Sequence, residues 1–169
     1  MAQYAAFLRA VNVGGTGKLP MADLRGLCEA VGFSNAKTFL ASGNVVFDTA
    51  LDLISAQAAL AKKLEKQLGK PVGLFLRSAT DLKAIVEANP FKTAEGNRLM
   101  VILLDHHPLD SVVLSAKNRR DEEIALGPRC LFVYYPSGMG QSKLKIPNVA
   151  HGTVRNMNTI CTVLEMLGG

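Results

Sequence analysis

The sequence predicts an α+β protein made of two related ferredoxin-like halves, each a βαββαβ unit with an antiparallel or mixed sheet. Two observations support this fold class. Short apolar runs alternate with amphipathic stretches in the order strand, helix, strand, strand, helix, strand, and part of that pattern recurs later in the chain. At 169 residues, 49% of them hydrophobic, the chain can bury one sizeable core or two small ones.

The first strand and helix are defined by their boundaries. The apolar run at residues 4–11 ends before a pair of glycines, which favours a buried strand. A helix begins near Pro20, a favourable first-turn residue, and ends at Gly32. Its apolar stripe consists of Met21, Leu24, Cys28 and Val31.

The remaining elements of the first half complete the plan. Residues 36–41 and 45–49 flank Ser42–Asn44, a turn whose Gly and Asn tolerate positive φ, and so predict a hairpin. A longer helix ends at Gly69, and residues 72–77 form a strand. We expect the apolar face of that helix to comprise Ile54, Ala58, Ala61, Leu64 and Leu68.

The second half repeats part of the first. The "FLR" of residues 7–9 recurs at 75–77, and "DLRGLCEAVGF" at 23–33 resembles "DLKAIVEANPF" at 81–91. In this alignment the first copy has extra residues between strand and helix, within the loop of residues 9–20. The alternative is convergence between two amphipathic helices. Further strands are expected at 98–105, 122–127 and 130–135, and helices at 110–118 and about 156–167. We predict halves of 1–77 and 78–169 in a single compact unit.

The opening loop, "RAVNVGGTGKLP", is the first candidate binding site. Three glycines allow main-chain N–H groups to converge, the following helix supplies a positive dipole end, and Lys18 adds a charge. We therefore expect an anion near Arg9, Asn12, Gly14, Gly15 and Lys18. A loop that needs glycine only to turn is the alternative. The spacing fits neither a Walker motif nor a dinucleotide fingerprint.

Other polar residues extend this candidate site. Arg9 and Arg77 are expected side by side on the sheet face away from the helices, separated by an anion or by Asp48. The stretch "YPSGMGQSKLKIP", with Lys143, has a composition that binds phosphate or simply turns the chain. The candidates are completed by the turn residues Ser42 and Asn44 and by Arg155, Asn156 and Asn158, expected at the start of the last helix, where Asn156 also suits a cap.

Composition narrows the class of function. The net charge of +5 is a mild indication of an acidic partner, although the lysines at 62–70 are typical of a solvated helix face. Three cysteines without a CxxC spacing indicate reduced core residues, and no cofactor or metal site is predicted.

No apolar run is long enough to span a bilayer, so we expect a cytoplasmic protein. No nucleophile or catalytic base is identifiable. The leading hypothesis is binding of a small phosphate- or carboxylate-bearing ligand; a nucleic-acid-binding or protein-interaction module is the alternative.

Five ordered motifs resemble a known family. They are "FLRAVNVGGTGKLPMADLRGL", "ASGNVVF", "NPF", "YPSGMGQSKL" and "TVRNMNTI", and together they are similar to the bacterial domain-of-unknown-function family 1697. The resemblance implies a duplicated α+β fold of ferredoxin-like halves in a cytoplasmic protein without an established activity. Met157 stands where members of that family often have tryptophan.

Overall fold

The chain is divided into two compact units, each with its own sheet. The computed structural model describes residues 1–12, 18–149 and 151–169. One unit comprises Met1–Asp81 with Val163–Gly169, and the other comprises Leu82–Thr162. Each sheet has four antiparallel strands, which confirms the predicted α+β class with ferredoxin-like halves.

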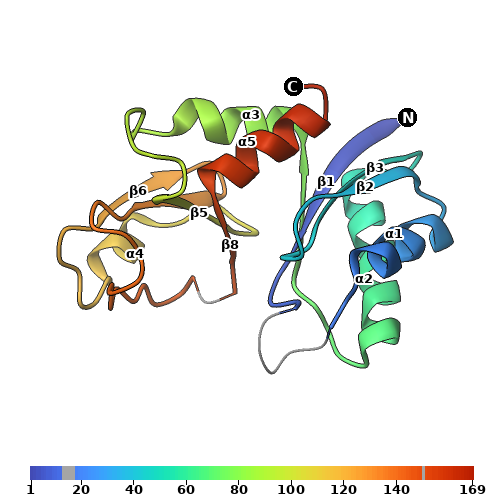
Figure 1. The fold of residues 1–169 in the computed structure, drawn as a ribbon, viewed down its shortest axis with the longest axis horizontal. Helices are drawn as coiled ribbons and strands as arrows, with labels where there is room; N and C mark the ends of the chain where they lie inside the picture. The colour runs from blue at the N-terminus through green and yellow to red at the C-terminus, as the bar shows by residue number, and fades with distance from the viewer. Residues whose placement is uncertain (13–17, 150) are drawn as a thin grey trace. The chain divides into compact units, whose positions relative to one another are not determined.

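Unit 1 has the six predicted elements of a ferredoxin-like fold. Its strands lie in the order β2-β3-β1-β4, with two helices on one face of the sheet (Figure 1). The elements are β1 (Ala2–Leu8), α1 (Met21–Ala30), β2 (Ser34–Thr38), β3 (Asn44–Thr49), α2 (Leu53–Leu68) and β4 (Leu74–Ser78).

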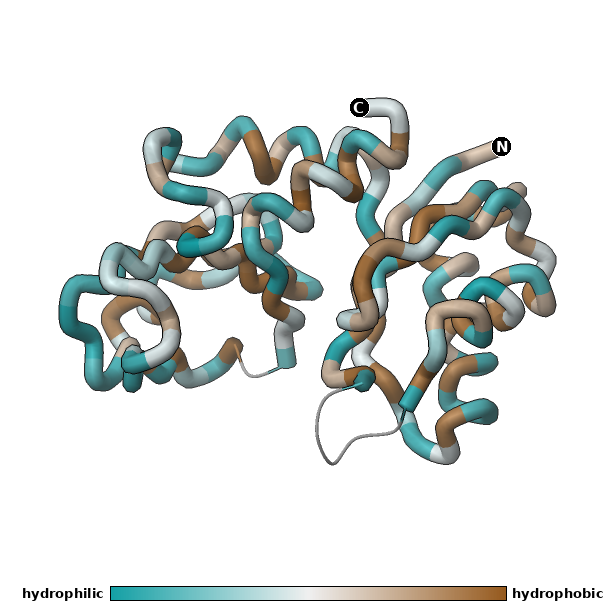
Figure 2. Tube along the Cα trace, viewed as in Figure 1, coloured by the Kyte–Doolittle hydropathy of each residue, from teal (hydrophilic) through white to brown (hydrophobic). Residues whose placement is uncertain are grey.

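The core of unit 1 lies between its sheet and its helices. Ala6 and Leu8 of β1 pack against α1 and α2, as the alternation of the strand predicts. Phe33 stacks on Phe47 with ring centroids 4.2 Å apart. Figure 2 shows hydrophobic stretches along the chain in the interior of unit 1 and mainly hydrophilic connections.

Helix α2 has clear ends, but its buried face differs from the predicted one. The Asp52 carboxylate accepts a 2.7 Å hydrogen bond from the Ser55 N–H, and Gly69 ends the helix with a φ of 75°. Ile54, expected in the core, is 81% exposed. At 100° per residue it lies about 120° around the helix from Leu60, which is buried.

Unit 2 has the strand order β6-β7-β5-β8. The strand Thr153–Asn156 was not predicted, because Arg155 and Asn156 were expected at the start of the last helix. Arg155 instead lies in a strand, paired with Val101. The elements are α3 (Ala79–Ala88), β5 (Leu99–Leu103), α4 (Asp110–Leu114), β6 (Glu123–Gly127), β7 (Cys130–Tyr134), β8 (Thr153–Asn156) and α5 (Met157–Met166), and the division between the units falls within α3 and α5.

The sheet orders correct the alignment of the two halves. β5 occupies in its sheet the place that β1 occupies in the other, and β6, β7 and β8 correspond to β2, β3 and β4. The sequence likeness instead matched β1–α1 with β4–α3. α4 therefore corresponds to α1, and the segment between β7 and β8, described at residues 135–149 and 151–152, takes the place of α2. Its residues Leu144, Ile146 and Val149 pack on the sheet core of unit 2.

None of the three cysteines forms a disulfide among the described residues. Cys28 and Cys130 are buried, as predicted, whereas Cys161 is half-buried. Burial, with a smaller effect of the Glu29 charge, raises the pKa of the Cys28 thiol to about 12. Cys28 is therefore protonated at neutral pH and acts as an apolar core side chain. No helix among the described residues is long and apolar enough to cross a membrane.

Candidate functional site

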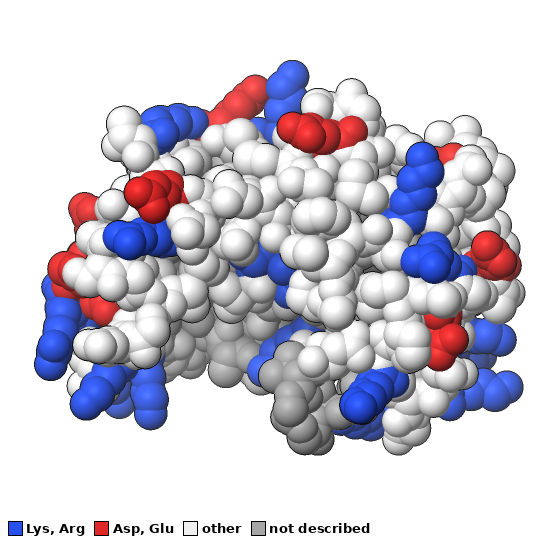
Figure 3. Space-filling view, viewed as in Figure 1, with Lys and Arg blue, Asp and Glu red and all other residues white. Residues whose placement is uncertain are grey.

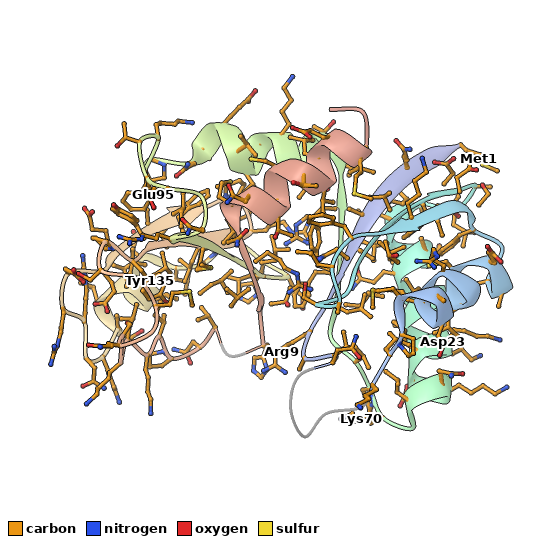
Figure 4. All side chains as sticks on the ribbon, viewed as in Figure 1. Met1, Arg9, Asp23, Lys70, Glu95 and Tyr135 are labelled. Atoms are coloured by element: carbon orange, nitrogen blue, oxygen red, sulfur yellow. The ribbon has the colours of Figure 1, made fainter. Side chains whose placement is uncertain are left out.

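Three segments of unit 1 meet at the end of β1. The Leu8 N–H donates to the Gly43 carbonyl, and the Arg9 N–H donates to the Gly73 carbonyl, each at 2.9 Å. The opening loop thus leaves the sheet between the Ser42–Asn44 turn and the chain that leads into β4. Figure 4 places Arg9 at this end of β1.

Asn12 joins the base of the opening loop to the neighbouring turn. Its amide nitrogen donates to the Leu19 carbonyl at 2.7 Å and to the Ala41 carbonyl at 2.8 Å. Its amide oxygen accepts from the Leu19 N–H at 2.6 Å. The residue has a φ of 56°, a left-handed conformation that asparagine tolerates better than most residues. One side chain therefore holds Leu19 and Ala41 together.

The Ser42–Asn44 turn has the compact geometry predicted for it. Asn44 is buried and donates to the Phe39 carbonyl at 2.7 Å and to the Ser42 hydroxyl at 3.1 Å. Gly43 has a φ of 93°, and a Cβ added there would lie 2.8 Å from Cγ2 of Val11. Glycine is required because the turn is packed directly onto the end of β1.

Positive groups gather around this junction. Arg9 and Lys18 are exposed, and the aliphatic part of Arg9 lies against Gly73. Helix α1 begins at Pro20 without a side-chain cap among the described residues, so the positive end of its dipole faces the same junction. Asp23, in the first turn, offsets part of that charge.

Sequence reasoning missed one cation. Lys70 was assigned to a solvated helix face, but it follows Gly69 and belongs to the segment that leads to Gly73. Figure 4 shows it at the same end of unit 1 as Arg9. The contact between Gly73 and Arg9 depends on pairing between β1 and β4, which a local pattern does not reveal.

Arg77 does not join this group, contrary to prediction. The antiparallel register pairs Phe7 with Phe75 and Ala5 with Arg77, whereas Arg9 bonds to Gly73. The two arginines are therefore at opposite ends of the strand pair, about 13 Å apart along β4. Arg77 is 1% exposed and donates to the Leu76 carbonyl at 3.0 Å.

Asp48 was expected between the two arginines. Its carboxylate instead accepts a 2.7 Å hydrogen bond from the amide of Asn35 on the neighbouring strand. The register pairs Asp48 with Gln3, near the beginning of β1, whereas Arg9 follows the end of that strand.

The structure places the other predicted residues in unit 2. Arg155 is 7% exposed and donates to the Thr153 hydroxyl at 2.8 Å and to the Val154 carbonyl at 2.9 Å. Burial lowers its pKa to about 10, so the guanidinium remains charged at neutral pH. Asn156 caps α5 by accepting from the Thr159 N–H at 2.9 Å, as predicted.

Asn158 is exposed and lies against the backbone of another loop. A Cβ added to Gly96 would lie 2.0 Å from the Asn158 amide oxygen, so Gly96 is required for this close approach. Lys143 is exposed on the segment that replaces the second helix. Gly14 and Gly15 lie outside the described residues.

The "YPSGMGQSK" stretch borders a polar cavity of about 420 Å³ in unit 2. The Ser137 hydroxyl donates to Asp121 and the Ser142 hydroxyl donates to Glu122. The hydrogen bonds from Ser142 and from the Arg120 N–H lower the pKa of the Glu122 carboxyl, which is therefore ionised at neutral pH. Both hydroxyl protons are thus used by carboxylates, and phosphate would meet acceptor groups here. The cavity is lined by Arg120, Asp121, Glu122, Ser137, Gly138, Gln141 and Ser142.

No group of three or more His, Cys, Asp or Glu side chains among the described residues could hold a metal ion. At the end of β1, Arg9 and Lys18 provide cationic groups and Asn12 provides an amide, and this chemistry suits a negatively charged ligand.

Comparison with known proteins identifies a family and a similar solved structure. A family described as "Protein of unknown function (DUF1697)" matches residues 1–132, so two of the five motifs lie beyond the matched region. A solved structure, described as conserved bacterial protein SP0830 from Streptococcus pneumoniae, is 25% identical, with a TM-score of 0.82 over 98% of each chain. The search of curated proteins gave no match.

Proposed function

This chain belongs to the DUF1697 family of proteins of unknown function, and we propose that its unit 1 binds a small phosphate- or carboxylate-bearing ligand at the end of β1. The observation that supports the proposal is the Asn12 bridge. By holding Leu19 and Ala41 together, it brings the segments that carry Arg9, Lys18 and Ser42 to one edge of the sheet.

The chemistry of these groups suits an anion. An arginine forms paired, charge-assisted hydrogen bonds to a phosphate or carboxylate, and a lysine adds a mobile positive charge. The dipole of α1 adds partial positive charge at Pro20. Lys70 gives the ligand a further cation at the same end of the unit.

Thermal unfolding with defined anions tests the proposal. The probes are inorganic phosphate, pyrophosphate, citrate, ribose 5-phosphate and ATP, each titrated at constant ionic strength. A ligand at about 100 times its Kd stabilises the folded state by about 2.7 kcal/mol, which raises the Tm by roughly 5–10 °C for a chain of this size. Arg9→Ala and Lys18→Ala are each expected to weaken binding about tenfold. Lys37→Ala, at an exposed position on β2, is the matched control.

The results distinguish the alternatives. If none of the five anions shifts the Tm, or if Arg9→Ala and Lys18→Ala respond like the control, the proposal is wrong. Salt-dependent binding of a single-stranded RNA oligonucleotide, lost in the same two variants, would instead favour the nucleic-acid alternative.

A further inference from the structure

A shallow groove runs between the two helices of unit 1. It has a volume of about 400 Å³ and is lined by Val31, Ala59, Lys62, Lys63 and Lys66. Val31 follows the end of α1, and the other four residues belong to α2. Val31 and Ala59 are half-buried, so the groove combines an apolar floor with a basic rim.

The lysines share one side of α2. At 100° per residue, Lys62, Lys63 and Lys66 fall within a sector of about 100° that also contains Ala59. Glu65 lies about 60° outside that sector. No acidic residue lines the groove. Figure 3 shows several basic side chains, with acidic ones between them, at the right-hand edge, where Figure 1 places α1 and α2.

Among the described residues, none of the three lysines forms an ion pair with an acidic side chain. Lys62 and Lys66 are four residues apart on one helix, a spacing at which like charges repel. The negative end of the α2 dipole offsets this repulsion for Lys66, in the last turn, but less for Lys62, a full turn earlier.

We propose that this groove docks an acidic amphipathic helix of a partner protein. In a helix that lies along α2, acidic residues four positions apart are about 6 Å apart, which matches the spacing of Lys62 and Lys66. The apolar side chains of that helix can then contact Val31 and Ala59. The lining contains neither arginine nor an aromatic side chain, the residues that recognise nucleic acids by paired hydrogen bonds and base stacking.

The groove shares no lining residue with the proposed anion site. Val31 lies about 15 Å along α1 from Pro20, whereas Lys66 precedes Lys70 by one turn of chain, about 6 Å. Since neither Arg9 nor Lys18 lines the groove, the variants at these two positions test the anion site alone, and either proposal can fail alone.

Fluorescence anisotropy with a designed peptide tests the groove. The probe is a labelled 18-residue peptide of glutamate and leucine, with leucines at helical spacing. A peptide of the same composition in scrambled order is its control. The double variant Lys62→Glu/Lys66→Glu reverses two charges in the groove, and Lys37→Glu/Lys83→Glu makes the same change at exposed positions elsewhere.

We expect the amphipathic peptide to bind more weakly as salt rises, and the groove variant to lose affinity about 30-fold, equivalent to about 2 kcal/mol. The control variant should remain within about twofold of wild type, and the scrambled peptide should bind at least about fivefold more weakly. The proposal is overturned by an absence of binding, by equal losses in both variants, by equal binding of both peptides, or by an oligonucleotide that binds more tightly with the same sensitivity to Lys62→Glu/Lys66→Glu. Circular dichroism confirms that each variant is folded.

Discussion

Replacing Asn12 by alanine is expected to lower the free energy of unfolding of unit 1 by about 2–3 kcal/mol. The variant loses three hydrogen bonds, two to Leu19 and one to Ala41. Asn12 is exposed, so water replaces part of each bond and the loss is about 0.5 kcal/mol per bond rather than the 1 kcal/mol of a buried pair. Alanine at a φ of 56° adds about 1 kcal/mol of backbone strain.

Urea unfolding followed by circular dichroism measures this change. Asn12→Gly is the matched variant, because it loses the same hydrogen bonds without the strain and should therefore be about 1 kcal/mol more stable than Asn12→Ala. Amide hydrogen exchange gives a local measurement, since the Leu19 N–H loses its acceptor and should exchange faster in both variants. An Asn12→Ala protein within about 0.5 kcal/mol of wild type, with unchanged exchange at Leu19, would refute the bridging role.

Two further predictions concern the turn before β3 and the loop of unit 2. Gly43→Ala should lower the free energy of unfolding in urea by about 3 kcal/mol, because the added Cβ would clash with Val11. Gly69→Ala, at a residue with a similar φ but open space around it, should lower it by about 1 kcal/mol. Equal losses in the two variants would contradict the packing argument. Ser142→Ala should raise the pKa of Glu122 toward 4.5. A carboxyl whose pKa is lower in the folded state stabilises the protein at neutral pH, and this stabilisation is lost as the pH falls below 4.5 and the carboxyl becomes protonated. The difference in stability between wild type and Ser142→Ala should therefore be largest at neutral pH and should narrow on acidification. A difference that does not change with pH would contradict this prediction.

The fold class was predictable because it depends on local signals. The apolar runs, Pro20 at the beginning of α1 and Gly69 at the end of α2 mark element boundaries wherever they occur in a chain. The missed strand β8 is short and polar, and its last residue, Asn156, also caps the next helix. Because Asn156 was recognised as a helix cap, the residues just before it were not considered as a strand. Ile54 was misplaced because an apolar residue in the first helical turn fits several faces equally well.

The candidate site was predictable only in part. The Ser42–Asn44 turn and the opening loop were recognised from their composition, but their junction depends on a bond from Asn12 to Ala41, far along the chain. Arg77 was wrongly paired with Arg9 because alternation gives the face of a strand and not its register. The distance between Arg9 and Arg77 depends on the register between β1 and β4, which only the tertiary structure shows.

The connection between β7 and β8 shows what the strand order of unit 2 does not depend on. Unit 2 has the strand order β6-β7-β5-β8 although the described residues between β7 and β8 form no helix, and unit 1 has the equivalent order with α2 in that position. The strand order therefore does not require a crossover helix in unit 2, where Leu144, Ile146 and Val149 provide the apolar cover that Ala56, Leu60 and Leu64 of α2 provide in unit 1.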